Sequence, residues 1–123
     1  MKKPKPPKPP KKLTKKKQQS MARTAKRKYL ADWSKVVREK YNNVCAICEQ
    51  PHARLNSHHL IEKSKLSAEM KLDPNLGIAL CPIHHRFGAA ISAHSNPIMF
   101  VKWLQENKPD AYEYVVHVSG GLS

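Results

Sequence analysis

Apolar residues recur at helical spacing through segment 25–41, with charged residues between them. The apolar positions are Tyr29, Leu30, Trp33, Val36, Val37 and Tyr41. This pattern predicts an amphipathic helix from about Ala25 to Tyr41, which Asn42 and Asn43 end.

Two short runs that follow are typical of strands. RLNSHHLI covers residues 54–61, and GIAL covers residues 77–80. Asp73 and Pro74 are turn formers in the polar loop between the runs. The pattern predicts a hairpin of two short strands.

Helical signals return after the second strand. The segment HHRFGAAISAH follows a proline suited to a helix start and predicts two or three helical turns. Asn96 and Pro97 resemble the cap and first residue of another helix, PIMFVKWLQEN, which offers Phe100, Trp103 and Leu104 to the core. AYEYVVHV is then a short helix or strand, and the last residues are flexible.

The positive charge is concentrated at the N-terminus. The chain has 123 residues, enough for one small domain, and a net charge of +14. Residues 1–28 hold thirteen basic and no acidic residues, and five of the ten prolines lie at or before Pro10. We expect an extended, disordered tail at 1–24, one domain at 25–118 and a flexible end at 119–123.

The composition also indicates where in the cell the protein is expected. No apolar run approaches a membrane span, and prolines and lysines stand where a signal peptide needs apolar residues. Three cysteines in a reducing compartment favour metal ligands over disulfides. We therefore expect an intracellular, cytoplasmic protein with no membrane partner.

The cysteines have the spacing of a zinc site. Cys45 and Cys48 form C-x2-C, and Cys81 follows 33 residues later with His84 in the position of a second pair. The chain has no other cysteine, so the predicted set is Cys45, Cys48, Cys81 and His84. Three buried apolar cysteines without a metal would not explain this spacing.

A second histidine group is expected beside the zinc site. Adjacent helical residues point about 100° apart, so His85 faces away from the zinc if His84 faces it. A hairpin followed by a helix brings His85 near His58 and His59. Spacing alone does not decide which of His58 and His59 binds a metal and which acts as a base, since neighbours on a strand face opposite sides.

The remaining histidines are weaker candidates. His52 could compete as a zinc ligand, but its loop setting beside Pro51 favours an exposed side chain. His94 and His117 are interpreted as ordinary surface or core-edge histidines, since neither has a ligand at useful spacing.

Together, SHHL from Ser57, DPNLGIALC from Asp73 and CPIHH from Cys81 resemble the HNH nuclease family with its ββα-metal motif, in its zinc-stapled branch. The resemblance covers about residues 33–90. His84 stands where that branch usually has a fourth cysteine. The segment SAHSNPIMFVKWL has a weaker similarity to phage recombination nucleases of the NinG type.

The resemblance implies a small α+β fold, a ββα-metal core with a structural zinc site and flanking helices. It implies that His59 is the general base and that His58 and His85 bind one divalent metal. Asn75 would brace the loop between the strands and so orient His59. The metal would be Mg²⁺ or Mn²⁺, with Zn²⁺ and Ni²⁺ as alternatives, and cleavage would leave 3′-hydroxyl and 5′-phosphate ends.

The partner implied is duplex or branched DNA, in a host cytoplasm if the chain is phage-encoded. Lysines of the tail would bind phosphates without sequence preference, together with Arg86 near the site. These lysines are Lys2, Lys3, Lys11, Lys12, Lys15, Lys16 and Lys17. Two alternatives stay open: a noncatalytic zinc module that binds nucleic acid, and a basic assembly protein whose tail binds RNA.

Overall fold

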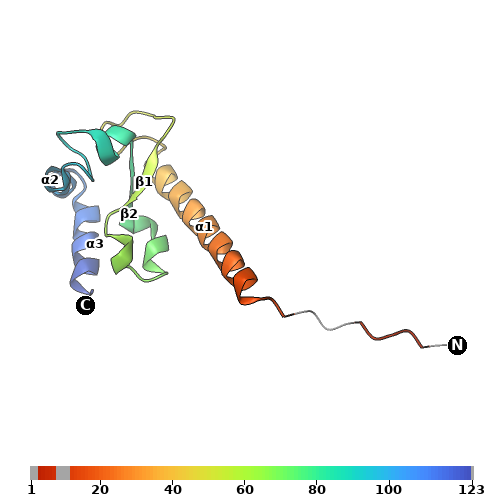
Figure 1. Ribbon diagram of the computed structural model, residues 1–123. Helices are drawn as coiled ribbons and strands as arrows, with labels where there is room; N and C mark the ends of the chain where they lie inside the picture. The colour runs from red at the N-terminus through yellow and green to blue at the C-terminus, as the bar shows by residue number, and fades with distance from the viewer. Residues whose placement is uncertain (1–2, 8–11, 123) are drawn as a thin grey trace.

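The computed structural model describes residues 3–7 and 12–122 and has a small α+β fold (Figure 1). A long N-terminal helix precedes a two-stranded antiparallel hairpin, and two helices follow it. The elements are α1 (Lys15–Lys40), β1 (Asn56–His59), β2 (Gly77–Leu80), the helical turn η4 (Ile83–Phe87), α2 (Pro97–Asn107) and α3 (Pro109–Gly120). The hairpin connection holds three short turns, η1 (Lys63–Lys65), η2 (Met70–Leu72) and η3 (Pro74–Leu76).

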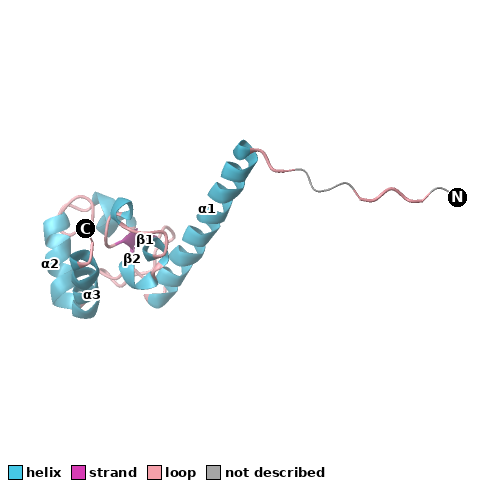
Figure 2. Cartoon of the chain, turned by 90° about the horizontal axis from the view of Figure 1, so that it is seen from below, coloured by secondary structure: helices cyan, strands magenta, loops and turns pink. Residues whose placement is uncertain are grey.

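Helix α1 begins ten residues before the predicted start. The Thr14 side chain caps it by accepting a hydrogen bond of 3.1 Å from the Lys17 backbone N–H. Extended backbone was expected to residue 24, and this is wrong for residues 15–24, where Lys, Gln, Ala and Arg favour a helix. The first half of α1 projects from the rest of the chain (Figures 1 and 2). Lys2 and Lys11 lie outside the described residues.

The end of α1 agrees with the sequence pattern. Asn42 and Asn43 both have φ of 57°, a left-handed conformation that asparagine tolerates better than most residues. The backbone N–H of Asn43 donates to the carbonyl of Arg38. The chain therefore turns sharply into the segment that carries Cys45.

The hairpin has the predicted strands. Asn56 pairs with Leu80 and His59 pairs with Gly77, with β2 fully buried. Its Ile78 and Leu80 join Cys45, Cys81, Phe100 and Leu104 in the main core cluster. Ile61, Leu66 and Leu76 form a second cluster beneath α3.

The predicted helix after Cys81 is wrong beyond Phe87. Only the π-helical turn η4 forms, where the Gly88 N–H donates to the Ile83 carbonyl at 2.6 Å. The next residues make an irregular loop, which Asn96 closes by donating from its side chain to the carbonyls of Ala89 and Ala90. These bonds replace the helical ladder that the sequence pattern suggests.

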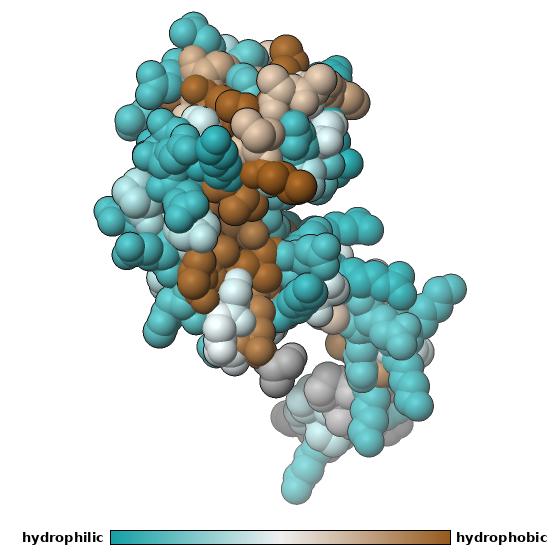
Figure 3. Space-filling view, turned by 90° about the vertical axis from the view of Figure 1, so that its left-hand side faces the viewer, coloured by the Kyte–Doolittle hydropathy of each residue, from teal (hydrophilic) through white to brown (hydrophobic). Residues whose placement is uncertain are grey.

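The C-terminal region is helical. Asn96 caps α2 and Pro97 is its first residue, as expected, and the ambiguous AYEYVVHV segment is part of α3. Of the end expected to be flexible at 119–123, Ser119 and Gly120 belong to α3, Leu122 packs against the second core cluster, and Ser123 lies outside the described residues. Apolar side chains gather on the side of the molecule where α2 and α3 lie (Figure 3). None of the helices in the described part of the chain is long and apolar enough to cross a membrane.

Gly77 lets α1 lie directly against the hairpin. A Cβ at this position would stand 2.6 Å from side-chain carbons of both Trp33 and Val37, the two buried residues of α1. Any larger residue would therefore push α1 away from β2.

We predict that Gly77→Ala lowers the free energy of unfolding by about 1–3 kcal/mol, because the added methyl group overpacks this contact. Urea denaturation of zinc-loaded protein measures the change. Gly120→Ala is the matched control, since an added Cβ there meets nothing within 4 Å. Equal stability of Gly77→Ala and wild type would contradict the close packing of α1.

Candidate metal centres

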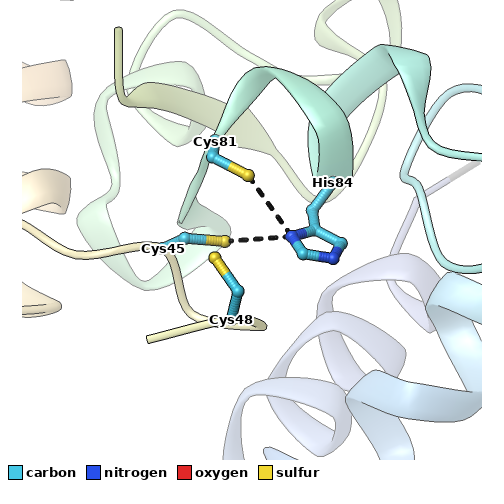
Figure 4. A group of neighbouring side chains, drawn as sticks. All are labelled: Cys45, Cys48, Cys81 and His84. Carbon is cyan, nitrogen blue, oxygen red and sulfur yellow. Dashed lines mark hydrogen bonds between the residues drawn. The ribbon is translucent and has the colours of Figure 1, made fainter. Parts of the chain in front are cut away.

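Three thiols and one imidazole point toward a common centre (Figure 4). The Nδ1 atom of His84 lies 3.3 Å from the sulfur of Cys81 and 3.6 Å from that of Cys45. The ligand atoms of Cys45, Cys48, Cys81 and His84 all lie within 4.8 Å of one another. Tetrahedral zinc with ordinary bond lengths places sulfur and nitrogen ligands about 3.5 Å apart. The four residues therefore fit a metal such as zinc, as the spacing predicted.

This cluster joins two segments that are far apart in sequence. Cys45 and Cys48 lie on the turn after α1, while Cys81 directly follows β2 and His84 lies on η4. Two backbone bonds hold the turn in place: the Ala46 N–H donates to the Ala79 carbonyl, and the Cys45 N–H donates to that of Gln50. The turn after α1 is thus fixed against the buried strand.

The thiols differ in how easily they ionise. Burial opposes ionisation of Cys45, but hydrogen bonds from the backbone N–H groups of Cys48, Cys81 and Ile47 lower its pKa overall. Burial raises the pKa of Cys48 to about 11. A bound cation would offset the free-energy cost of ionising this thiol, since zinc binds thiolates.

His52 lies beside the cluster, contrary to the exposed loop histidine that the sequence favoured. It is half-buried, and its Nε2 is 3.3 Å from the sulfur of Cys48. An imidazole N–H at this distance can donate to a thiolate. His52 therefore stands next to the four ligands rather than among them.

A second group of side chains contains His58, His85 and His94. The Nε2 atom of His85 lies 3.2 Å from Nδ1 of His58 and 3.1 Å from Nε2 of His94. One ring nitrogen has either one hydrogen or one lone pair, so a hydrogen bond satisfies only one of these two contacts well. Nitrogen ligands on one cation lie about 3.0–3.3 Å apart, given metal–nitrogen bonds of about 2.1 Å. The three nitrogens therefore also fit a divalent cation.

His94 is exposed, as expected of a surface histidine, but it also lies against His85, and backbone pairing explains this contact. The N–H groups of Ala93 and His94 donate to the carbonyls of His84 and His85, each at 2.9 Å. These bonds fold the loop after Gly88 back onto η4 and bring His94 to His85. The nine-residue separation of His85 and His94 matches no helical ligand spacing. The contact therefore could not be predicted from the sequence pattern, since it depends on the hydrogen bonds of the loop.

Burial keeps His58 and His85 neutral. Desolvation, aided by the nearby imidazoles of His85 and His94, lowers the pKa of His58 to about 3. Desolvation, with His94 and Arg86 close by, lowers that of His85 to about 4. The ring of Phe100, in edge-to-face contact at 5.9 Å, covers His58. Neutral imidazole is the form that binds metals.

His59 lies on the other side of β1 and has a different environment, as strand geometry predicts. Its ring stacks on Trp33, with centroids 3.9 Å apart and planes 9° from parallel. Its Nε2–H donates to the Lys71 carbonyl at 2.9 Å, so Nδ1 carries the lone pair. Burial lowers the pKa of His59 despite this hydrogen bond. His59 is thus a neutral imidazole with a fixed ring and one nitrogen able to accept a proton.

Asn75 does not contact His59. Its side-chain oxygen accepts a 2.8 Å hydrogen bond from Lys40, and its N–H donates to the Asp73 carboxylate. Trp33 and the Lys71 carbonyl contact the His59 ring directly, while Asn75 contacts Lys40 and Asp73 from the loop between the strands. Trp33 is itself fixed, because its Nε1–H donates to the Asp73 carbonyl at 2.9 Å.

One cleft of about 680 Å³ joins the two sides of β1. His58, His59, His85 and His94 all line it. The exposed Arg86 lines it too, together with Lys63. Of the predicted phosphate-binding lysines, Lys3 and Lys12 precede α1, and Lys15, Lys16 and Lys17 lie in its exposed first turn.

No family model matches this chain, and neither does any curated protein or any solved structure.

We predict that His94→Ala weakens cation binding at the histidine group while the cysteine cluster keeps its zinc. Loss of one of three ligands should lower the metal affinity by more than the roughly 10–100-fold that follows loss of a residue that only hydrogen-bonds to a ligand. Calorimetric titration of zinc-loaded protein with Ni²⁺ measures this affinity, with zinc content checked before and after.

The exposed His117 on α3 provides the control, since His117→Ala removes an imidazole outside both clusters. Unchanged Ni²⁺ affinity in His94→Ala would show that His94 is not a ligand.

Proposed function

We propose that this protein is a metal-dependent DNA endonuclease of the HNH type, with a ββα-metal core formed by β1, β2 and η4. The observation that carries the proposal is one cleft holding two kinds of histidine. His58, His85 and His94 turn nitrogens toward a common point, while His59 is held separately as a neutral imidazole. Hydrolysis of a phosphodiester needs both a positive charge and a base.

The order of the paired histidines supports this assignment. The resemblance to HNH nucleases gives the first histidine to the metal and the second to the base. In the structure, His58 faces His85 and His94, and His59 faces Trp33. Spacing alone left the order open, and the surroundings of the two rings agree with the family's order.

His59 would act as the general base through Nδ1. Its other nitrogen is bonded to the Lys71 carbonyl, which fixes the tautomer, and stacking on Trp33 fixes the ring plane. A water molecule in the cleft would lose a proton to Nδ1 as its oxygen bonds to phosphorus. The bond from phosphorus to the 3′ oxygen would break, and that oxygen would take a proton from solvent.

A divalent cation held by His58, His85 and His94 would supply positive charge that stabilises the phosphate and the leaving oxygen in the transition state. Arg86 is exposed at the rim of the cleft and would contact a neighbouring phosphate. The cysteine cluster has a structural role, because it fixes η4 and with it His85.

We predict that zinc-loaded protein nicks supercoiled plasmid when Mg²⁺ or Mn²⁺ is added, and that His59→Ala lowers the rate by about 100-fold or more. DNA affinity and folding should be unchanged in this variant. Gel assays of nicked product measure the rate, with His117→Ala as the control for loss of an imidazole.

The control reaction without Mg²⁺ or Mn²⁺ contains no chelator, because a chelator would also remove the structural zinc. If folded, zinc-loaded wild type cuts neither linear nor branched DNA with either metal, the proposal is wrong and a noncatalytic zinc module becomes the better account. Cutting by His59→Ala at the wild-type rate would remove His59 as the base.

A further inference from the structure

The first half of α1 is an exposed helical segment that carries basic but no acidic residues. Every residue from 15 to 29 is exposed, and the first fully buried residue of the helix is Trp33. Residues 15–28 include seven basic and no acidic residues. The basic residues are Lys15, Lys16, Lys17, Arg23, Lys26, Arg27 and Lys28. We call residues 15–29 the arm.

The N-terminal part of the arm stands out from the body of the protein in both ribbon views (Figures 1 and 2), while Lys26 and Tyr29 border a pocket shared with Lys71 and Leu72. The arm carries little apolar surface of its own: within residues 15–29 only Met21, Ala22, Ala25 and Tyr29 are apolar. Insertion into a lipid surface needs a broad apolar helix face, which the arm lacks. The charge therefore favours a polyanion such as nucleic acid.

Helical periodicity places part of this charge on one defined side. Residues seven apart share a helix face, since seven residues make about two turns. Lys16 and Arg23 are thus in line with Leu30 and Val37, and Lys26 is in line with Trp33. The basic stripe of Lys16, Arg23 and Lys26 lies on the same side of α1 as the residues that pack against the hairpin.

The stripe therefore starts close to His59. Trp33 stacks on the His59 ring, and Lys26 is seven residues, or about 10 Å, further along the helix. Lys16 is about 26 Å from Trp33 by the same measure. A duplex seated in the cleft and continuing along this side of α1 would present phosphates to all three residues.

We infer that Lys16, Arg23 and Lys26 form a rigid binding stripe for duplex DNA that extends the contact surface outward from His59. The inference rests on the proposed function, which makes duplex DNA the substrate of the cleft. It adds a fixed direction to the interaction, because a helix continuous with the core holds its charges in one geometry.

The test compares two charge-matched double variants, both in a His59→Ala background so that no DNA is cut. Lys16→Gln with Lys26→Gln removes two charges from the stripe. Lys17→Gln with Lys28→Gln removes two from the other side of the same helix. Fluorescence anisotropy measures affinity for a duplex of about 30 base pairs at several salt concentrations.

We predict that the stripe variant binds about tenfold more weakly or worse near 0.1 M salt, with the salt slope reduced by about 1.8, because two phosphate contacts are lost. The off-stripe variant should lose less than about threefold. Equal losses in both variants would show diffuse attraction without a defined face, and no loss in either would remove the arm from the interface. Both results overturn the inference.

A second comparison tests rigidity. Thr24 is exposed within the arm, so Thr24→Pro should break the helix without altering charge, and Thr24→Ala is the control. The stripe predicts weaker binding for Thr24→Pro alone. Wild-type affinity in Thr24→Pro would show that the arm works as a flexible tail and would overturn the inference.

Binding and cutting separate this inference from the proposed function. Stripe-dependent binding by a zinc-loaded wild type that never cuts would leave the stripe intact and refute the nuclease. If the wild type cuts DNA but the two double variants bind DNA equally well, the nuclease proposal stands and the stripe is refuted. Stripe-dependent binding to anionic vesicles or to duplex RNA, with no preference for DNA, would overturn the assignment to DNA.

Discussion

The Cys3His cluster is the constraint on which the rest of the structure depends. It ties the turn after α1 to the end of β2 and the start of η4, segments more than thirty residues apart. A chain of this size has a small apolar core, so a metal bound across these segments would add to its stability. His84 and His85 are adjacent, and fixing the first toward the cysteines directs the second toward His58.

A second constraint acts on the opposite side of the hairpin. Gly77 admits Trp33 and Val37 at close range, and Trp33 in turn fixes the ring of His59, the partner of Gly77 across the hairpin. The helix that carries Trp33 continues outward as the basic arm. The same packing contact therefore sets the geometry of the proposed base and the direction in which the basic arm extends from the cleft.

The sequence predicted what depends on local pattern and ligand spacing. The β2 boundaries, the cap at Asn96 and the cysteine set all follow from such signals. His94 escaped prediction because loop hydrogen bonds to η4, not spacing, bring it to His85. Helix α1 starts earlier than the apolar pattern predicts, because helix propensity and the Thr14 cap outweigh the repulsion among its lysines. The role expected of Asn75 came from the resemblance alone, and local pattern gives no sign of the bond that its side chain accepts from Lys40.

The central claim is that two cation sites of different chemistry lie on either side of η4. X-ray absorption at the zinc edge, with one and then two equivalents of zinc, tests it most directly. The account predicts that the first equivalent has three sulfur neighbours at about 2.3 Å and one nitrogen at about 2.0 Å, and that the second adds only nitrogen and oxygen neighbours. A first equivalent surrounded by nitrogen and oxygen alone would contradict it.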